Sequence, residues 1–179
     1  MTPQEQSKIT GLIKSNKVVI MPTDTIYGIV GLADSPEVIE RIYQIKDREH
    51  TKPFVVLISD YSQLESLGVD LTEEQKTYLE TVWPGPTSVI IPTTEMEYLH
   101  RGLNSLAIRL PNTKWLKEIV DKTGPIIATS ANIAGEPYIH DLTKITDLLS
   151  DKVDYISQAN SPKSNPSRII NIVDKANLR

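Results

Sequence analysis

Short, continuous apolar runs recur along this chain and are separated by polar or helix-like stretches. The clearest run is 54–58, which reads Phe-Val-Val-Leu-Ile directly after Pro53 and predicts a buried strand. The same criterion predicts further strands at 17–21, 87–91, 106–110, 126–129, 153–156 and 169–173.

Helices are predicted where apolar residues recur every three or four positions. Ser35 is a favourable N-cap, and Pro36 suits the first position of the helix that follows. Thr72 likewise caps a helix that carries Glu73 and Glu74 in its first turn. The predicted helices are 4–14, 36–45, 61–67, 72–82 and 113–122.

These strands and helices mix without strict alternation, which predicts an α/β fold with a mixed, twisted sheet flanked by helices. The length of 179 residues corresponds to a single domain, 1–179, that is large enough to bury a core. Apolar residues make up 39% and charged residues 23% of the chain, as in ordinary globular proteins.

Composition and charge exclude several functions. The chain has no cysteine, which rules out disulfides, thiolate nucleophiles and cysteine-based zinc sites. The net charge of −4 makes general attraction to nucleic acid unfavourable. No apolar stretch approaches the roughly 20 residues of a membrane span, and the polar first residues show no secretion signal. We therefore expect a cytoplasmic enzyme without a membrane contact.

The densest basic segment follows the helix predicted at 36–45 and contains Lys46, Arg48, His50 and Lys52 at alternating positions. In an extended loop, alternation places these side chains on one side, where they suit a single anionic ligand. A solvated loop between a helix and a strand is the alternative interpretation of this segment.

Two polar motifs follow buried strands, at the strand ends where open sheets place ligands. Residues 22–28 read Pro-Thr-Asp-Thr-Ile-Tyr-Gly, and Ser130-Ala131-Asn132 follows the strand predicted at 126–129. Serine hydroxyl and asparagine amide groups are neutral hydrogen-bond donors for phosphate or carboxylate oxygens. Hydroxyl-rich turns that satisfy their own backbone remain the alternative for both motifs.

Arg109 interrupts the apolar strand predicted at 106–110 and therefore needs an anionic partner or an exit to solvent. A substrate carboxylate held by two parallel hydrogen bonds is one interpretation, and a structural ion pair is the other. The three histidines show no metal-ligand spacing, so we expect no metal held by the protein. The chain also lacks a P-loop, so any ATP site must be built differently.

Seven segments together carry a resemblance to a known family. They are PTDTIYG at 22–28, KDR at 46–48, KPFVVLI at 52–58, WPGP at 83–86, LAIRLP at 106–111, ATSAN at 128–132 and a serine-containing strand at 167–173. In this order, and over nearly the whole chain, they resemble the YrdC-like family of threonylcarbamoyl-AMP synthases. The family signature is Lys-x-Arg combined with Ser-x-Asn.

The resemblance implies a twisted sheet around a large basic cavity that converts L-threonine, bicarbonate and ATP into L-threonylcarbamoyladenylate and pyrophosphate. It assigns catalysis to Lys46 and Arg48. The ATP site that it implies comprises Lys46, Arg48, His50, Ser105, Ser130, Asn132, Tyr138 and Arg179. The threonine site that it implies comprises Thr23, Arg109 and Ser167. In this last motif the family usually has Ser-Thr, whereas this chain has Ser167-Arg168.

The resemblance also implies partners. Mg²⁺ would arrive with ATP and be bound largely through the phosphates. The adenylate would pass to proteins that transfer threonylcarbamoyl to tRNA, with at most a weak direct tRNA contact. Because the chain ends at Arg179, we expect the short, single-domain form of the family. The alternatives are an RNA- or tRNA-binding module, or an inactive paralogue, of the same fold.

Overall fold

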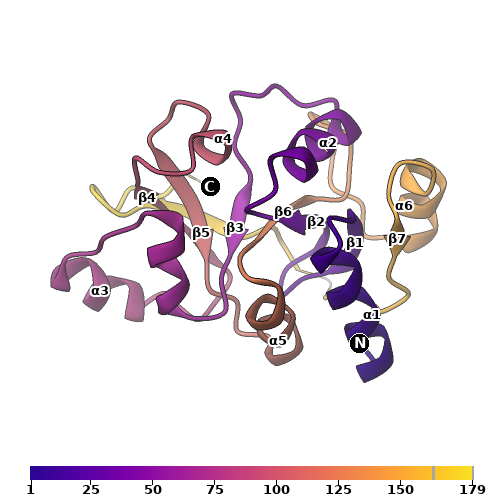
Figure 1. Ribbon diagram of the computed structural model, residues 1–179, viewed down its shortest axis with the longest axis horizontal. Coiled ribbons are helices and arrows are strands. Elements are labelled where there is room, and N and C mark those ends of the chain that lie inside the picture. Colours follow the sequence, from indigo (N-terminus) through magenta and orange to yellow (C-terminus); the bar gives the residue numbers. More distant parts are fainter. Residues whose placement is uncertain (163, 179) are drawn as a thin grey trace.

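The structure is a computed structural model that describes residues 1–162 and 164–178. The described residues form one mixed sheet with the strand order β7-β1-β2-β6-β3-β5-β4-β8 (Figure 1). The strands are β1 (Val19–Pro22), β2 (Tyr27–Leu32), β3 (Val55–Leu57), β4 (Thr87–Pro92), β5 (Ser105–Arg109), β6 (Ile126–Ser130), β7 (Tyr155–Ile156) and β8 (Arg168–Asn171). The pairs β1/β7, β3/β5 and β4/β8 are parallel and the others are antiparallel. The predicted mixed α/β fold is therefore confirmed.

The helices begin at the predicted caps. The Ser35 hydroxyl accepts a hydrogen bond from the Val38 backbone N–H, and Thr72 forms a reciprocal capping box with Gln75. The segment predicted as a helix at 61–67 is a 3₁₀ helix. The helices are α1 (Pro3–Lys14), α2 (Pro36–Lys46), the 3₁₀ helix η1 (Tyr61–Leu67), α3 (Glu73–Glu80), α4 (Glu97–His100), α5 (Lys114–Thr123) and α6 (Leu142–Leu149).

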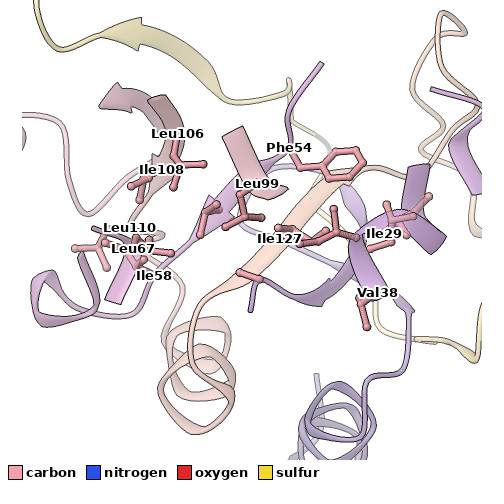
Figure 2. Packing of buried hydrophobic residues seen from close by; sticks show 14 of the residues in the cluster. Ile29, Val38, Phe54, Ile58, Leu67, Leu99, Leu106, Ile108, Leu110 and Ile127 are labelled. Carbon is pink, nitrogen blue, oxygen red and sulfur yellow. The ribbon is translucent and has the colours of Figure 1, made fainter. Parts of the chain in front are cut away.

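Side chains alternate between the two faces of the sheet and build two apolar layers. Ile20, Ile29 and Val56 point to the face that α2 and α4 cover, where Figure 2 shows Ile29, Val38 and Ile127 in one packed layer. The opposite face packs against α1 and α5, which lie on the other side of the sheet from α2 and α4 (Figure 1). None of the helices within the described residues is long and apolar enough to cross a bilayer.

The register of the central strands aligns a row of apolar residues on the second face. Ala128 of β6 lies opposite Val55 of β3, which lies opposite Ala107 of β5, which lies opposite Ile90 of β4. Two of these four side chains are alanines, so the row occupies little volume above the sheet. Residues of this row border a cavity beyond the area that α1 and α5 cover.

Candidate active site

The cavity has a volume of about 420 Å³, which lies within the range of small-molecule sites. Its floor is the apolar row of β6, β3, β5 and β4. Its walls come from four segments: the β1–β2 turn, the loop after α2, the loop after β6 and the segment that leads into β8. Candidate residues from these four segments and from the ends of β5 and β6 line it, namely Thr23, Arg48, Arg109, Ser130, Asn132, Tyr138 and Ser167.

The β1–β2 turn is held by its own hydroxyl groups. The Thr23 hydroxyl donates to the Ile26 carbonyl oxygen at 2.8 Å and accepts from the Thr25 backbone N–H at 3.2 Å. The Thr23 and Thr25 hydroxyl oxygens are 3.1 Å apart. The hydroxyl groups of the turn therefore satisfy its own backbone, as one interpretation of the motif predicted, and the turn lines the cavity as well.

Lys46 lies behind the cavity wall. Only 1% of this residue is exposed, and its ammonium group donates to the Ser130 carbonyl at 2.7 Å, the Asn132 carbonyl at 2.7 Å and Asn132 Oδ1 at 3.0 Å. Burial lowers the pKa of Lys46 to about 7, and the charge of Arg48 adds to the lowering. The first basic residue of the Lys-x-Arg motif thus contacts the Ser-x-Asn motif directly, across 84 positions of sequence.

The loop after α2 begins with Asp47 in the left-handed conformation, which turns the chain toward the cavity. Arg48 lines the cavity, and its Nε and Nη2 atoms donate to the carbonyl oxygens of Lys52 at 2.8 Å and Pro53 at 3.2 Å. His50 instead stacks on the Tyr43 ring, with ring centroids 4.7 Å apart. The alternation of the basic segment therefore does not bring His50 to the cavity lining beside Arg48.

Ser130 and Asn132 form the wall above the end of β6. The Ser130 hydroxyl donates to Asn132 Oδ1 at 2.6 Å, and the Asn132 amide donates to the Glu136 carbonyl oxygen. Glu136 itself lines the cavity. Because Lys46 also donates to Asn132 Oδ1, one asparagine connects α2, the end of β6 and the following loop.

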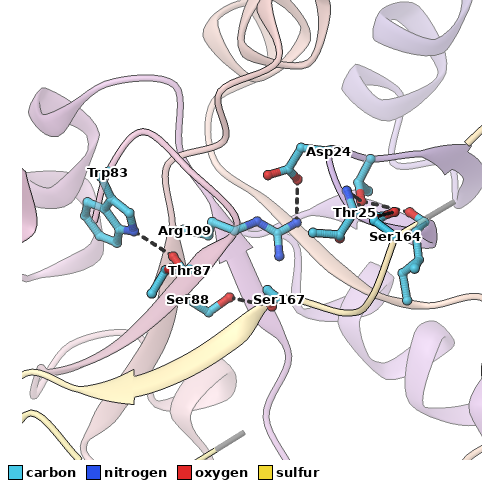
Figure 3. Close-up of polar contacts among 10 residues, drawn as sticks. Asp24, Thr25, Trp83, Thr87, Ser88, Arg109, Ser164 and Ser167 are labelled. Carbon is cyan, nitrogen blue, oxygen red and sulfur yellow. Dashed lines mark hydrogen bonds and ion pairs between the residues drawn. The ribbon is translucent and has the colours of Figure 1, made fainter. Parts of the chain in front are cut away.

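Arg109 lines the cavity from the end of β5 and forms an ion pair with Asp24. Arg109 Nη2 lies 2.9 Å from Asp24 Oδ1, and the two side chains are 5% and 7% exposed (Figure 3). Burial raises the pKa of Asp24, although the charge of Arg109 opposes this shift. The ion pair predicted as an alternative for Arg109 is present, and the same guanidinium borders the cavity.

The remaining predicted residues are distributed unevenly. The Ser167 hydroxyl lies 3.0 Å from that of Ser88 (Figure 3), and Ser167 is one of the residues that line the cavity. Tyr138 lines the cavity, with its hydroxyl 3.4 Å from Asn165 Oδ1. Ser105, at the start of β5, pairs with Pro92 and is not among the lining residues. Arg179 lies outside the described residues.

The sequence interpretation missed Asp24 and Glu136. Asp24 is the one acidic residue in the 22–28 motif, so its charge could have marked it as a partner for Arg109. Glu136 follows the Ser-x-Asn motif by four residues, and nothing in its local pattern marks it as part of a site. Within residues 1–162 and 164–178, no group of three histidine or acidic side chains could hold a metal ion.

Comparison with known proteins places this fold and cavity in a family. The model of the Sua5/YciO/YrdC family, described as "Telomere recombination", matches residues 11–179. The chain belongs to this family. It is 35% identical over 135 residues to a threonylcarbamoyl-AMP synthase of Bacillus subtilis strain 168, which covers 73% of this chain and 39% of that relative. It is 28% identical to a threonylcarbamoyl-AMP synthase of Photorhabdus laumondii, over 94% of this chain and 91% of that relative.

Solved structures show the same fold. Pyrococcus abyssi Sua5 in complex with L-threonine superposes with a TM-score of 0.86 at 26% identity, over 96% of this chain and 52% of that one. Escherichia coli YciO superposes with a TM-score of 0.85 at 20% identity, over 99% of this chain and 88% of that one. The chain thus spans well under two thirds of the length of some relatives, such as the Bacillus subtilis synthase, and most of the length of others.

Proposed function

We propose that this protein is an L-threonylcarbamoyladenylate synthase, a nucleotidyltransferase that uses L-threonine, bicarbonate and ATP. The observation that carries the proposal is the placement of two guanidinium groups on one cavity, with Arg48 in the loop after α2 and Arg109 paired with Asp24 of the β1–β2 turn. A polyphosphate and a carboxylate are both anions that guanidinium groups bind, so each of the two arginines can bind one of them. The names of the relatives and the L-threonine bound to the Pyrococcus abyssi protein support it.

The proposed reaction has two steps. The threonine amine attacks the carbon of bicarbonate and forms a carbamate with loss of water. A carbamate oxygen then attacks the α-phosphorus of ATP, the bond between the α-phosphorus and the bridging oxygen breaks, and pyrophosphate leaves. The carbamate is already an anionic nucleophile, so this step needs positioning and charge stabilisation more than a general base.

The phosphates of ATP are proposed to lie against Arg48, Ser130 and Asn132. Arg48 supplies positive charge beside the leaving pyrophosphate, and the Ser130 and Asn132 side chains supply neutral polar contacts. Lys46 supports this wall from behind through three hydrogen bonds. Tyr138, which lines the cavity, offers an aromatic ring for the nucleoside. Mg²⁺ is proposed to enter with ATP, because it is commonly held by substrate phosphates and one or two carboxylates.

Threonine is proposed to lie between Arg109 and Ser167, with its carboxylate on the guanidinium. The Thr23 hydroxyl already makes three contacts within its turn. We therefore propose that Thr23 contacts the threonine substrate through its methyl group. The cytoplasmic product is proposed to pass to proteins that transfer threonylcarbamoyl to tRNA. Direct RNA binding is disfavoured by the net charge of −4.

The test is to incubate the protein with ATP, Mg²⁺, L-threonine and bicarbonate and to detect threonylcarbamoyladenylate by mass spectrometry. We expect the adenylate only when all three substrates are present, and a loss of about 10²-fold or more in rate for Arg48→Ala. Lys52→Ala is the matched control, because Lys52 lies in the same loop with its side chain 59% exposed. Absence of a threonine-dependent nucleotide product would exclude the proposal, and tight, salt-sensitive tRNA binding without it would favour an RNA-binding module.

A further inference from the structure

Asp24 is a buried acid that lies directly against a cavity-lining arginine. Its Oδ1 atom accepts from Arg109 Nη2 at 2.9 Å, and both side chains are more than nine-tenths buried. Figure 3 shows the carboxylate and the guanidinium facing each other, with Arg109 reaching from β5 toward the β1–β2 turn. Arg109 borders the cavity, whereas Asp24 does not belong to its lining. A substrate can therefore meet Asp24 only through Arg109.

The turn that carries Asp24 is held by hydrogen bonds on both sides of this residue. Thr23 makes three contacts within the turn, and the Thr25 carbonyl oxygen accepts a hydrogen bond from the Ser164 hydroxyl. Pro22 and Tyr27 pair at the ends of β1 and β2 and close the turn. The hydrogen-bonded backbone therefore holds the Asp24 carboxylate in place. The carboxylate in turn orients the Arg109 guanidinium that it contacts.

The second carboxylate oxygen argues against a purely stabilising pair. Asp24 Oδ2 is buried and has no hydrogen-bond partner among the described residues. A buried pair contributes stability only when its remaining lone pairs are satisfied, and a buried oxygen without a donor is costly. Burial accordingly raises the pKa of this acid. Proteins retain a buried oxygen without a hydrogen-bond donor mainly where it contributes to a functional site.

We propose that Asp24 is a positioning residue of the amino-acid site, which orients the Arg109 guanidinium so that it receives the carboxylate of the substrate. The inference rests on the proposed function. A planar guanidinium can serve two carboxylates along different edges, so contact with Asp24 and contact with a substrate are compatible. Removing the charge of Asp24 replaces a charge-assisted hydrogen bond with a weaker neutral one, so Asp24 holds the guanidinium less firmly.

The test is Asp24→Asn, which keeps the size of the side chain and removes its charge. We expect the KM for L-threonine to rise at least tenfold while the KM for ATP stays within twofold. Threonine binding measured by calorimetry in the presence of a non-hydrolysable ATP analogue should weaken by the same factor. Asp24→Glu keeps the charge but displaces it by one methylene group, and we expect a smaller rise of at least threefold. Asp34→Asn, an exposed acid in the β2–α2 connection, should change neither constant.

A double-mutant cycle separates positioning from a general structural effect. If Asp24 acts through Arg109, then Asp24→Asn introduced into Arg109→Gln should change the threonine KM less than threefold. Additive effects in this cycle would overturn the inference. An unchanged or lowered threonine KM in both Asp24 variants, with the wild-type protein active, would also overturn it and leave the proposed function intact. A wild-type protein that makes no threonine-dependent adenylate would instead overturn both. If Asp24→Asn does not fold, Asp24→Glu provides the test alone. A threonine KM raised at least threefold with an ATP KM within twofold supports the inference, and an unchanged threonine KM overturns it.

Discussion

Replacing Lys46 with methionine tests whether the first basic residue of the Lys-x-Arg motif supports the cavity wall or binds phosphate itself. Methionine has a similar length and no charge, so it removes the ammonium group without leaving a large void. The substitution deletes the three hydrogen bonds from Lys46 to Ser130 and Asn132. The question is how much stability depends on these bonds.

The size of the effect follows from what the three acceptors retain. The Ser130 carbonyl also accepts from the Asn132 backbone N–H at 2.9 Å, and Asn132 Oδ1 also accepts from the Ser130 hydroxyl at 2.6 Å. The Asn132 carbonyl oxygen loses its contact with Lys46. The Asn132 carbonyl is left without this donor, and the other two acceptors each lose one of their hydrogen bonds. Together these losses reduce the free energy of unfolding by roughly 3–5 kcal/mol. The substitution also removes a positive charge that is unfavourable in a buried position, and this offsets part of the cost. We expect a net loss of about 2–3 kcal/mol.

The assay is thermal unfolding followed by circular dichroism, together with turnover and ATP binding. For a domain of this size, a loss of about 2–3 kcal/mol lowers the Tm by roughly 4–12 °C. Lys52→Met is the control, because its ion pair with Glu49 is exposed on both sides and is worth at most about 1 kcal/mol. A Tm of Lys46→Met within 1–2 °C of the wild type, combined with weakened ATP binding, would refute the supporting role and show direct phosphate contact.

Further predictions concern the guanidinium groups, pH and packing. Arg48→Lys should lower kcat at least tenfold with little change in Tm, because lysine cannot reproduce the planar fork; equal kcat values would contradict this. Arg109→Lys should raise the threonine KM and leave the ATP KM nearly unchanged; a purely structural ion pair would lower Tm and move neither KM. Because the folded-state pKa of Lys46 is about 7 and its ordinary value is 10.5, the unfolded state binds more protons between these values. Stability measured by urea unfolding should therefore rise between pH 7 and 10, and should rise less in Lys46→Met. Gly31→Ala should destabilise the protein because its Cβ would collide with Val38 of α2; Val38→Ala should recover part of the loss, and additive losses would contradict this packing.

Most of the fold followed from apolar patterning, but β2, α4 and α6 were not predicted. β2 was not predicted because Gly28 and Gly31 interrupt its apolar run. Gly31 is compatible with the strand because the Val38 side chain fills the space where a Cβ would lie. α6 was also missed, although Leu142, Ile145 and Leu149 repeat with helical spacing after the Asp141 cap. The sequence therefore carries the signal for α6.

The sequence predicted which segments form the site. It did not predict which of their side chains lie buried behind the cavity wall or contact one another. Motifs such as 22–28 and 130–132 meet at one cavity because the sheet order brings the ends of β1, β2 and β6 together. Sequence could not show that Lys46 points inward behind Asn132, since a basic residue at a helix end usually reaches solvent. It could not show the contact between Asp24 and Arg109 either, because the two residues are 85 positions apart.

The proposed synthase activity is tested by following [¹⁴C]bicarbonate and pyrophosphate in one reaction with ATP, Mg²⁺ and L-threonine. We predict that label enters a nucleotide fraction at the same rate as pyrophosphate appears, in equal amounts, and that both rates vanish when threonine is omitted. Pyrophosphate release that is independent of threonine, or a nucleotide fraction without label, would contradict it.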